Sequence, residues 1–196
     1  MPIVTHVHGQ HTTDESDGYA EAWYLPSAKN IPADFAKVGT FYETFRRQFL
    51  DEHGADWQPG SSTFQYPNKQ AAATLWYHDH VLGMTRLNVY AGPAGFYLLR
   101  GGPFDMPPGQ LPNGPYEIPI VIQDRSFDAG PGNRAPLFYP NSRLCFDDAT
   151  GVPPIWNPEF FGNTMVVNGR TWPRLRVEPR HYRFRFLNGA TPGSSS

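Results

Sequence analysis

Four of the seven histidines occur in two H-x-H patterns, His6-Val7-His8 and His78-Asp79-His80, which lie 72 positions apart. In an extended strand, residues i and i+2 face the same side, so each pattern presents two imidazoles in one direction. Two such strands side by side would form a cluster of four imidazoles. Imidazole binds copper, zinc, iron and nickel, and copper(II) has the highest affinity of the divalent series. The two patterns therefore predict a metal site and leave the identity of the metal open.

The residues next to each pattern support this interpretation. Gly9 follows the first pair and permits a turn or a close backbone approach at the end of a strand. The apolar run Leu75-Trp76-Tyr77 precedes the second pair, as in a buried strand that delivers its histidines at one end. A single H-x-H pattern is equally compatible with an exposed strand, whereas two of them favour a shared metal site.

Short strands must position these histidines. With 21 prolines, 19 glycines and 15% aromatic residues, the composition favours an all-β fold of short strands and irregular loops. The strand at 181–187 has the clearest alternation, and we expect its aromatic residues to form the inner face of a half-buried strand. The expected strands are Ile3–His8, Thr63–Tyr66, Thr74–His78, Ala94–Arg100, Glu117–Gln123, Thr164–Asn168, Leu175–Val177 and His181–Leu187.

One short helical excursion interrupts the strands. Phe41, Phe45 and Phe49 recur every four residues within 33–52, and Gly54 is a suitable helix stop. The pair Asn168-Gly169 predicts a tight turn after the strand at 164–168.

The charge balance excludes some functions. With 16 basic and 18 acidic residues the net charge is −2, which gives no electrostatic reason to bind nucleic acid or an anionic membrane. No apolar run approaches the roughly 18 residues of a membrane-spanning helix. The first residues of the sequence lack the charged and apolar regions of a signal peptide. The single cysteine, Cys145, excludes an internal disulfide.

Three runs contain or neighbour the histidine pairs: His6–Gly9 (HVHG), Ser16–Trp23 (SDGYAEAW) and Leu75–His80 (LWYHDH). They closely resemble the multicopper oxidase family, and most of all its bacterial spore-coat laccase and bilirubin oxidase branch. The resemblance extends over about residues 5–190. Further matching runs are Phe64–Asn68 (FQYPN), Thr85–Gly92 (TRLNVYAG) and Val177–Phe186 (VEPRHYRFRF).

The resemblance implies cupredoxin-like Greek-key β-barrel or β-sandwich domains. Residues 1–105 would be part of a first domain that carries both H-x-H patterns, and residues 117–190 part of a second. The Gly- and Pro-rich residues 106–116 would link them, residues 126–161 would form a long loop, and residues 191–196 a flexible tail. Both ends are abrupt, as in a piece of a longer protein.

The resemblance also implies the cofactor. In this family a type 1 copper takes electrons from a reducing substrate, and a trinuclear copper cluster uses them to reduce dioxygen to water. By resemblance, His6 binds the type 2 copper, His8 and His78 share one type 3 copper, and His80 binds the other. The expected partners of the full-length enzyme are dioxygen and a small phenolic or pigment reductant.

Three other residues could have a functional role in such a site. Asp17 matches a family position that relays protons to the cluster, although a turn cap within residues 14–18 is the simpler alternative. Asp79 should face away from its two histidine neighbours on a strand, as a supporting or surface group rather than a ligand. Cys145 lacks the flanking histidines of the family's type 1 cysteine, so we reject it as the type 1 copper ligand.

The chain holds four of the eight histidines that the family's cluster needs, and it holds no type 1 site. We therefore expect this chain alone to be inactive, although the parent protein would be an oxidase. Two alternatives stay open: a non-catalytic copper-binding cupredoxin-like module, and a zinc or binuclear metallohydrolase. The second is weakened because the sequence has no H-x-H-x-D-H run. The family resemblance is compatible with a spore-coat, secreted or periplasmic location and does not choose among them.

Overall fold

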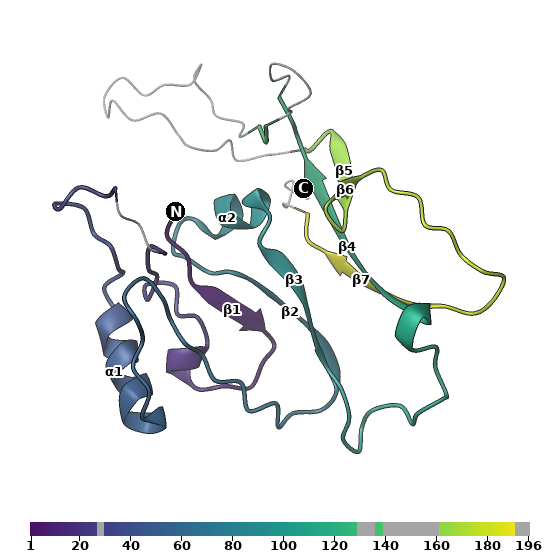
Figure 1. Cartoon of the computed structure of the whole chain (residues 1–196), viewed down its shortest axis with the longest axis horizontal. Coiled ribbons are helices and arrows are strands. Elements are labelled where there is room, and N and C mark those ends of the chain that lie inside the picture. The colour runs from purple at the N-terminus through teal and green to yellow at the C-terminus, as the bar shows by residue number, and fades with distance from the viewer. Residues whose placement is uncertain (27–29, 129–135, 139–160, 191–196) are drawn as a thin grey trace, which may run out of the picture. The chain divides into compact units, whose positions relative to one another are not determined.

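The computed structural model describes residues 1–26, 30–128, 136–138 and 161–190 (Figure 1). Cys145, the expected tail at 191–196 and most of the expected loop at 126–161 lie outside the described residues. The chain divides into two compact units, Met1–Gln110 and Leu111–Ser196. Within the described ranges, no helix has the length and apolar character that crossing a lipid bilayer requires.

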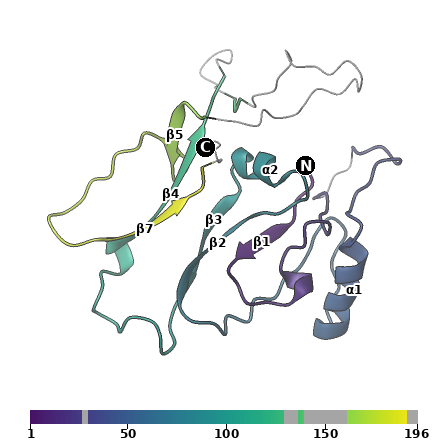
Figure 2. The same ribbon diagram turned by 180° about the vertical axis from the view of Figure 1, so that it is seen from behind.

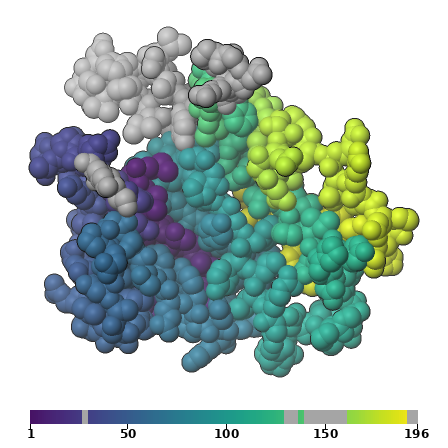
Figure 3. Space-filling view, viewed as in Figure 1, coloured from purple at the N-terminus to yellow at the C-terminus, as the bar shows by residue number. Residues whose placement is uncertain are grey.

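A three-stranded antiparallel sheet is the frame of the first unit, with the order β1-β2-β3. Its strands are β1 (Thr5–His8), β2 (Ala73–Asp79) and β3 (Ala94–Leu99), close to three of the predicted strands. The register places His6 opposite His78, so the two histidine pairs lie on neighbouring strands as predicted. The space-filling view shows the purple N-terminal segment between blue and teal parts of the same unit (Figure 3).

Helix α1 (Tyr42–His53) packs its apolar stripe into the core of this unit. It ends at Gly54, whose left-handed φ of 67° confirms the predicted stop, but it begins nine residues later than the expected start of the pattern at Ala33. Both ribbon views place α1 on the β1 side of the sheet (Figures 1 and 2). The buried core residues are Ala22, Tyr42, Phe45, Phe49 and Trp57.

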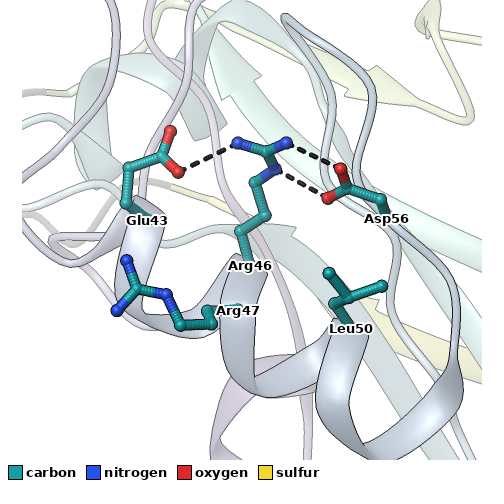
Figure 4. A pocket seen from close by; sticks show the side chains of 5 residues that line it. All are labelled: Glu43, Arg46, Arg47, Leu50 and Asp56. Atoms are coloured by element: carbon teal, nitrogen blue, oxygen red, sulfur yellow. Dashed lines mark hydrogen bonds and ion pairs between the residues drawn. The ribbon is translucent and has the colours of Figure 1, made fainter.

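The outer face of α1 is held to the following loop by a charged cluster. Arg46 donates two hydrogen bonds of 2.7 Å to the Asp56 carboxylate and one of 3.0 Å to Glu43 (Figure 4). These three side chains, with Arg47 and Leu50, line a shallow surface pocket. The two carboxylates satisfy the Arg46 guanidinium, so the cluster fastens the loop at Asp56 to the helix.

The first unit differs from the sequence prediction in two segments. Thr85–Ala91 forms a second helix, α2, which the expectation of one helical excursion omitted. Residues 63–66 do not form the expected strand, because their backbone pairs with side chains: the Gln65 N–H donates to Ser16, and its carbonyl accepts from Thr12. A short 3₁₀ helix, η1 (Asp14–Ser16), lies in the loop after β1.

The second unit is built on a four-stranded sheet of order β6-β5-β4-β7. Strands β4 and β7 run parallel and the other pairs run antiparallel. The predicted turn is confirmed, because Asn168 and Gly169 have φ values of 47° and 76° between β5 and β6. Residues 175–177 do not form the expected strand. The elements are η2 (Gly114–Tyr116), β4 (Glu117–Arg125), β5 (Thr164–Val167), β6 (Arg170–Thr171) and β7 (Arg183–Asn188).

The two faces of β7 are opposite to the prediction. Phe184 and Phe186 are 41% and 65% exposed, so the aromatic face is the outer one in this unit. On the other face, Arg185 donates a 2.6 Å hydrogen bond to Glu117, and Arg183 lies 3.5 Å from the same carboxylate oxygen. The Glu117 side chain is only 5% exposed, and a carboxylate this buried requires cationic partners. That requirement decides which face of β7 turns inward.

Candidate metal centre

All four histidines of the two H-x-H patterns lie in one cluster. The ring of His6 is the hub, with centroid distances of 5.5 Å to His8, 5.5 Å to His78 and 4.9 Å to His80. The ring of His78 lies 5.8 Å from those of His8 and His80. This geometry follows from the i, i+2 spacing on two strands whose register aligns His6 with His78.

Backbone carbonyls orient three of the four rings. The Nδ1 atom lies 2.6 Å from the Asp17 carbonyl in His6, 2.7 Å from the Asp79 carbonyl in His78, and 3.1 Å from the Gly18 carbonyl in His80. A carbonyl oxygen can only accept a hydrogen bond, so Nδ1 carries the proton in each ring. The Nε2 atom of each neutral ring then keeps its lone pair, which is the form that binds a metal.

His8 is held by packing instead. Its exposed ring stacks on Trp76 at 5.5 Å with an interplanar angle of 25°, and Trp76 also lies 4.3 Å from the ring of His78. Trp76 therefore packs against two histidines of the cluster. His6, His8 and His78 each offer a nitrogen within 4.8 Å of the other two. A set of nitrogens at this separation can converge on metal ions.

The environment of His78 favours the neutral ring. Only 8% of this residue is exposed, and burial lowers the pKa of its imidazole. The neighbouring imidazoles lower the pKa of His78 further, while the bond to the Asp79 carbonyl partly opposes the shift. A neutral imidazole retains the lone pair that a metal requires.

The loop that supplies two of the orienting carbonyls lies directly against β1. A Cβ atom at Gly18 would be 2.1 Å from the Thr5 carbonyl oxygen and 3.0 Å from the Cα of His6. Gly18 also has a left-handed φ of 78°. Only glycine permits this approach, which brings the carbonyls of Asp17 and Gly18 to the rings of His6 and His80.

Asp17 lies at the solvent side of the cluster. Its carboxylate is 3.2 Å from His6 Nδ1, and half of its side chain is exposed. The Asp17 backbone N–H also bonds to the Asp14 carbonyl at the end of η1. The residue thus belongs to a turn, as the simpler alternative required, and it also contacts a cluster histidine.

Asp79 faces away from the imidazoles as expected, but it is buried rather than on the surface. It is 5% exposed, and its carboxylate accepts hydrogen bonds from the backbone of Val4 and Val81 and from Asn88. Sequence inspection gave no role to Asn88, Gly18 or Trp76. All three stood within runs that suggested the family, but no local pattern indicated the part that each plays.

The remaining histidines do not join the cluster. His11 and His181 are exposed. His53 is partly buried: its ring packs 4.5 Å from Phe49, and its Nε2 lies 3.5 Å from the Glu15 carboxylate. Glu15 also accepts from Thr13, Ser16 and Gln48, so these contacts account for the buried carboxylate as a structural anchor of η1 on α1.

Curated relatives match nearly the whole of this chain. A laccase of Bacillus stratosphericus is 42% identical over 191 residues, which is 97% of this chain and 32% of the relative. A laccase of Bacillus subtilis is 38% identical over 190 residues, or 97% of this chain and 31% of the relative. The chain belongs to the multicopper oxidase family. It spans about a third of the length of these curated multicopper oxidases.

The fold agrees with that membership. The crystal structure of a variant of the multicopper oxidase McoA from Aquifex aeolicus superposes with a TM-score of 0.57 at 23% identity. The match covers 97% of this chain and 32% of the McoA variant. The mainly β architecture is the cupredoxin-like fold that was predicted. A comparison with models of protein families gave no match.

Copper is the metal that multicopper oxidase membership implies. The donor set fits it, because neutral imidazoles are good ligands for copper and three of these rings present a free Nε2. Each of those three rings also has the hydrogen bond on its other nitrogen that usually fixes a metal-binding histidine.

Proposed function

We propose that the chain supplies half of the ligands of a trinuclear copper cluster in an oxidase. His6 binds the type 2 copper, His8 and His78 share one type 3 copper, and His80 binds the other. The observation that carries the proposal is the gathering of four imidazoles, three of them with Nδ1 bonded to a backbone carbonyl and Nε2 free. When bound, copper would couple one-electron oxidation of a phenolic or pigment substrate to the reduction of dioxygen to water.

The residues of the chain have distinct parts in this function. The carbonyls of Asp17, Gly18 and Asp79 hold three rings in a fixed tautomer, so that the ligand atoms are ready before metal binds. The half-exposed Asp17 carboxylate connects solvent with His6, and we propose that it relays the protons that water formation consumes.

The same proposal covers the domain plan. Residues 1–105 form part of a first cupredoxin-like domain and residues 117–190 part of a second, joined by the linker at 106–116. The division of the chain into Met1–Gln110 and Leu111–Ser196 supports a boundary in this region.

This chain alone should not act as a laccase. It holds four of the eight cluster histidines, and Cys145 has Leu144 and Phe146 where the family's type 1 cysteine has histidines. Without a type 1 site, electrons from a phenol have no normal route to the cluster.

Copper titration of the purified chain, followed by electron paramagnetic resonance, tests the metal site. We expect nitrogen-coordinated copper(II) without a blue thiolate absorption. The signal should weaken in His6→Ala and His78→Ala but not in His11→Ala, a matched control that removes an exposed histidine outside the cluster. Equal signals in all three variants would contradict the proposal, and selective zinc binding would favour the metallohydrolase alternative.

Oxygen uptake tests the catalytic part. The copper-loaded chain should consume no oxygen with a phenolic dye, whereas a protein of the relatives' full length should oxidise it. Rapid oxidation by this chain alone would contradict its predicted inactivity. A full-length protein that binds copper but consumes no oxygen would favour the non-catalytic copper-binding module.

A further inference from the structure

We propose that Asp79 and Asn88 form a positioning pair that sets the spacing between the two histidine pairs. The inference rests on the proposed metal role of those histidines. The side chain of Asp79 faces away from the imidazoles, although its backbone carbonyl bonds to His78 Nδ1. Both act through the backbone segments from which the imidazoles project.

The Asp79 carboxylate joins the two segments that carry the histidines. Its Oδ1 accepts a 3.1 Å hydrogen bond from the N–H of Val4, two residues before His6. Its Oδ2 accepts a 3.1 Å bond from the N–H of Val81, directly after His80. The His80 N–H in turn donates to the Val4 carbonyl at 2.8 Å. One side chain therefore fixes the point where β1 and β2 meet beside three of the four ligands.

Asn88 extends this link to α2 and to the N-terminal segment. It is completely buried, and its amide nitrogen donates to Asp79 Oδ2 at 2.8 Å and to the Pro2 carbonyl at 2.9 Å. Both partners only accept, so the amide cannot be reversed without placing its oxygen against two oxygens. Both amide hydrogens are thus committed to the contacts that hold β1 beside β2.

The amide oxygen of Asn88 indicates that this residue is present for its donors. Among the described residues, Asn88 Oδ1 is buried without a protein hydrogen-bond partner. Burying an acceptor in this way costs stability, which an apolar side chain of the same size would avoid. An apolar side chain would, however, leave the Pro2 carbonyl and Asp79 Oδ2 without these donors. The amide instead supplies the two donors that orient Asp79 and Pro2.

Two variants of the full chain and one control separate positioning from general stability. Asp79→Asn keeps the shape of the side chain but replaces one carboxylate oxygen with an NH₂ group. That group cannot accept the hydrogen bonds that Val4, Val81 and Asn88 donate to Asp79. Asn88→Leu removes both donors and leaves the two backbone bonds of Asp79 intact. Tyr42→Phe is the control, because it removes a 2.6 Å bond from a buried tyrosine to the Ser61 carbonyl without any contact with the cluster.

The first readout needs no metal. Long-range proton–nitrogen spectra of the histidine rings report which nitrogen carries the proton. In the parent chain and in Tyr42→Phe, His6, His78 and His80 should be in the Nδ1–H form. In Asp79→Asn the rings of His6 and His80 should show mixed tautomers, because the backbone segments that carry these rings would shift relative to the carbonyls of Asp17 and Gly18.

The second readout is the dissociation constant for copper(II), measured against a competing chelator. Asp79→Asn should weaken binding about 10- to 100-fold, as the loss of groups that support metal ligands does elsewhere. Asn88→Leu should weaken it less, and Tyr42→Phe should leave it unchanged. If Asp79→Asn does not fold, Asn88→Leu decides the question.

Two results would overturn the positioning role. In the first, Asp79→Asn lowers the thermal midpoint of unfolding but keeps the histidine tautomers of the parent chain. Its copper dissociation constant then changes less than about threefold, which is below the effect of losing groups that support metal ligands. The other is an equal loss of copper affinity in Tyr42→Phe. If the parent chain itself bound no copper, the proposed metal site would fail, and the tautomer comparison alone would still decide the role of Asp79.

Discussion

Gly18→Ala should disturb the histidine cluster, because the added methyl group would press the Gly18 loop against β1. The new Cβ would lie 2.1 Å from the Thr5 carbonyl oxygen, whereas real Cβ contacts essentially never fall below 3.0 Å. The loop and β1 must therefore separate by about 0.9 Å. Such a shift would stretch the 3.1 Å bond between the Gly18 carbonyl and His80 Nδ1 beyond hydrogen-bonding distance.

The cost of this substitution has two parts. The left-handed φ of 78° costs an alanine about 1 kcal/mol. Forcing the backbones apart costs about 1–3 kcal/mol more, as overpacking does in well-packed cores. The total is about 2–4 kcal/mol, which corresponds to a fall of roughly 1–2 M in the urea midpoint for a domain of ordinary denaturant sensitivity.

Gly54→Ala is the matched control. Gly54 also has a left-handed φ, of 67°, but a Cβ there meets no atom within 4 Å. It should lose only the conformational part, about 1 kcal/mol. Urea unfolding followed by tryptophan fluorescence gives both values, and copper titration tests the cluster. If the two variants lost equal stability and bound copper alike, the inference that the Gly18 loop is pressed against β1 would be refuted.

Three further substitutions have defined expectations. Burial raises the pKa of Glu15, but hydrogen bonds from Thr13, Ser16 and His53 outweigh it and hold the pKa below its ordinary value of 4.5. The ionised carboxylate therefore stabilises the fold fully above pH 4.5, and its contribution is lost as pH falls through the lower folded-state pKa. Glu15→Gln should cost about 1–3 kcal/mol at neutral pH and progressively less in acid, and a pH-independent loss in urea titrations would contradict this. Phe49→Ala should cost about 3–5 kcal/mol by opening a cavity beside Trp57, while copper affinity in the surviving folded protein should stay unchanged. Arg46→Ala should leave the urea midpoint nearly unchanged, because side-chain entropy offsets the attraction of an exposed ion pair and salt screens it. A large fall in the urea midpoint at high salt would show that the Arg46 ion pairs in Figure 4 stabilise the fold more than their exposure implies.

The histidine cluster could be predicted because its signal is local. The i, i+2 spacing fixes the direction of each pair whatever the rest of the chain does, and the apolar run before His78 marks a strand. The register that aligns His6 with His78 depends on contacts far apart in sequence, so the pairing could be expected but its alignment could not be calculated. The helix stop at Gly54 was likewise local, since a left-handed residue ends a helix by its own geometry.

The features that were missed all depend on tertiary contacts. Thr85–Ala91 contains Val89 and Tyr90, whose intrinsic preference is for strands, yet it is helical with Asn88 bonded to Pro2 and Asp79. In β7 the alternation was read correctly as a strand, but hydrophobicity pointed to the wrong inner face. The buried Glu117, a residue with no periodic signal, draws the arginines inward instead.

The pairing of β1 with β2 also fixes when the cluster can form. The bond from Val4 to Asp79 joins residues 75 positions apart, so closing it requires the chain to lose the entropy of a long loop before any contact compensates. During synthesis, His6 and His8 emerge well before their partners and can offer a metal only two flexible ligands. Metal bound by all four imidazoles would favour the folded chain by mass action. The complete four-imidazole site therefore cannot form before the chain closes, and the rate of that closure sets the earliest time at which the cluster can assemble.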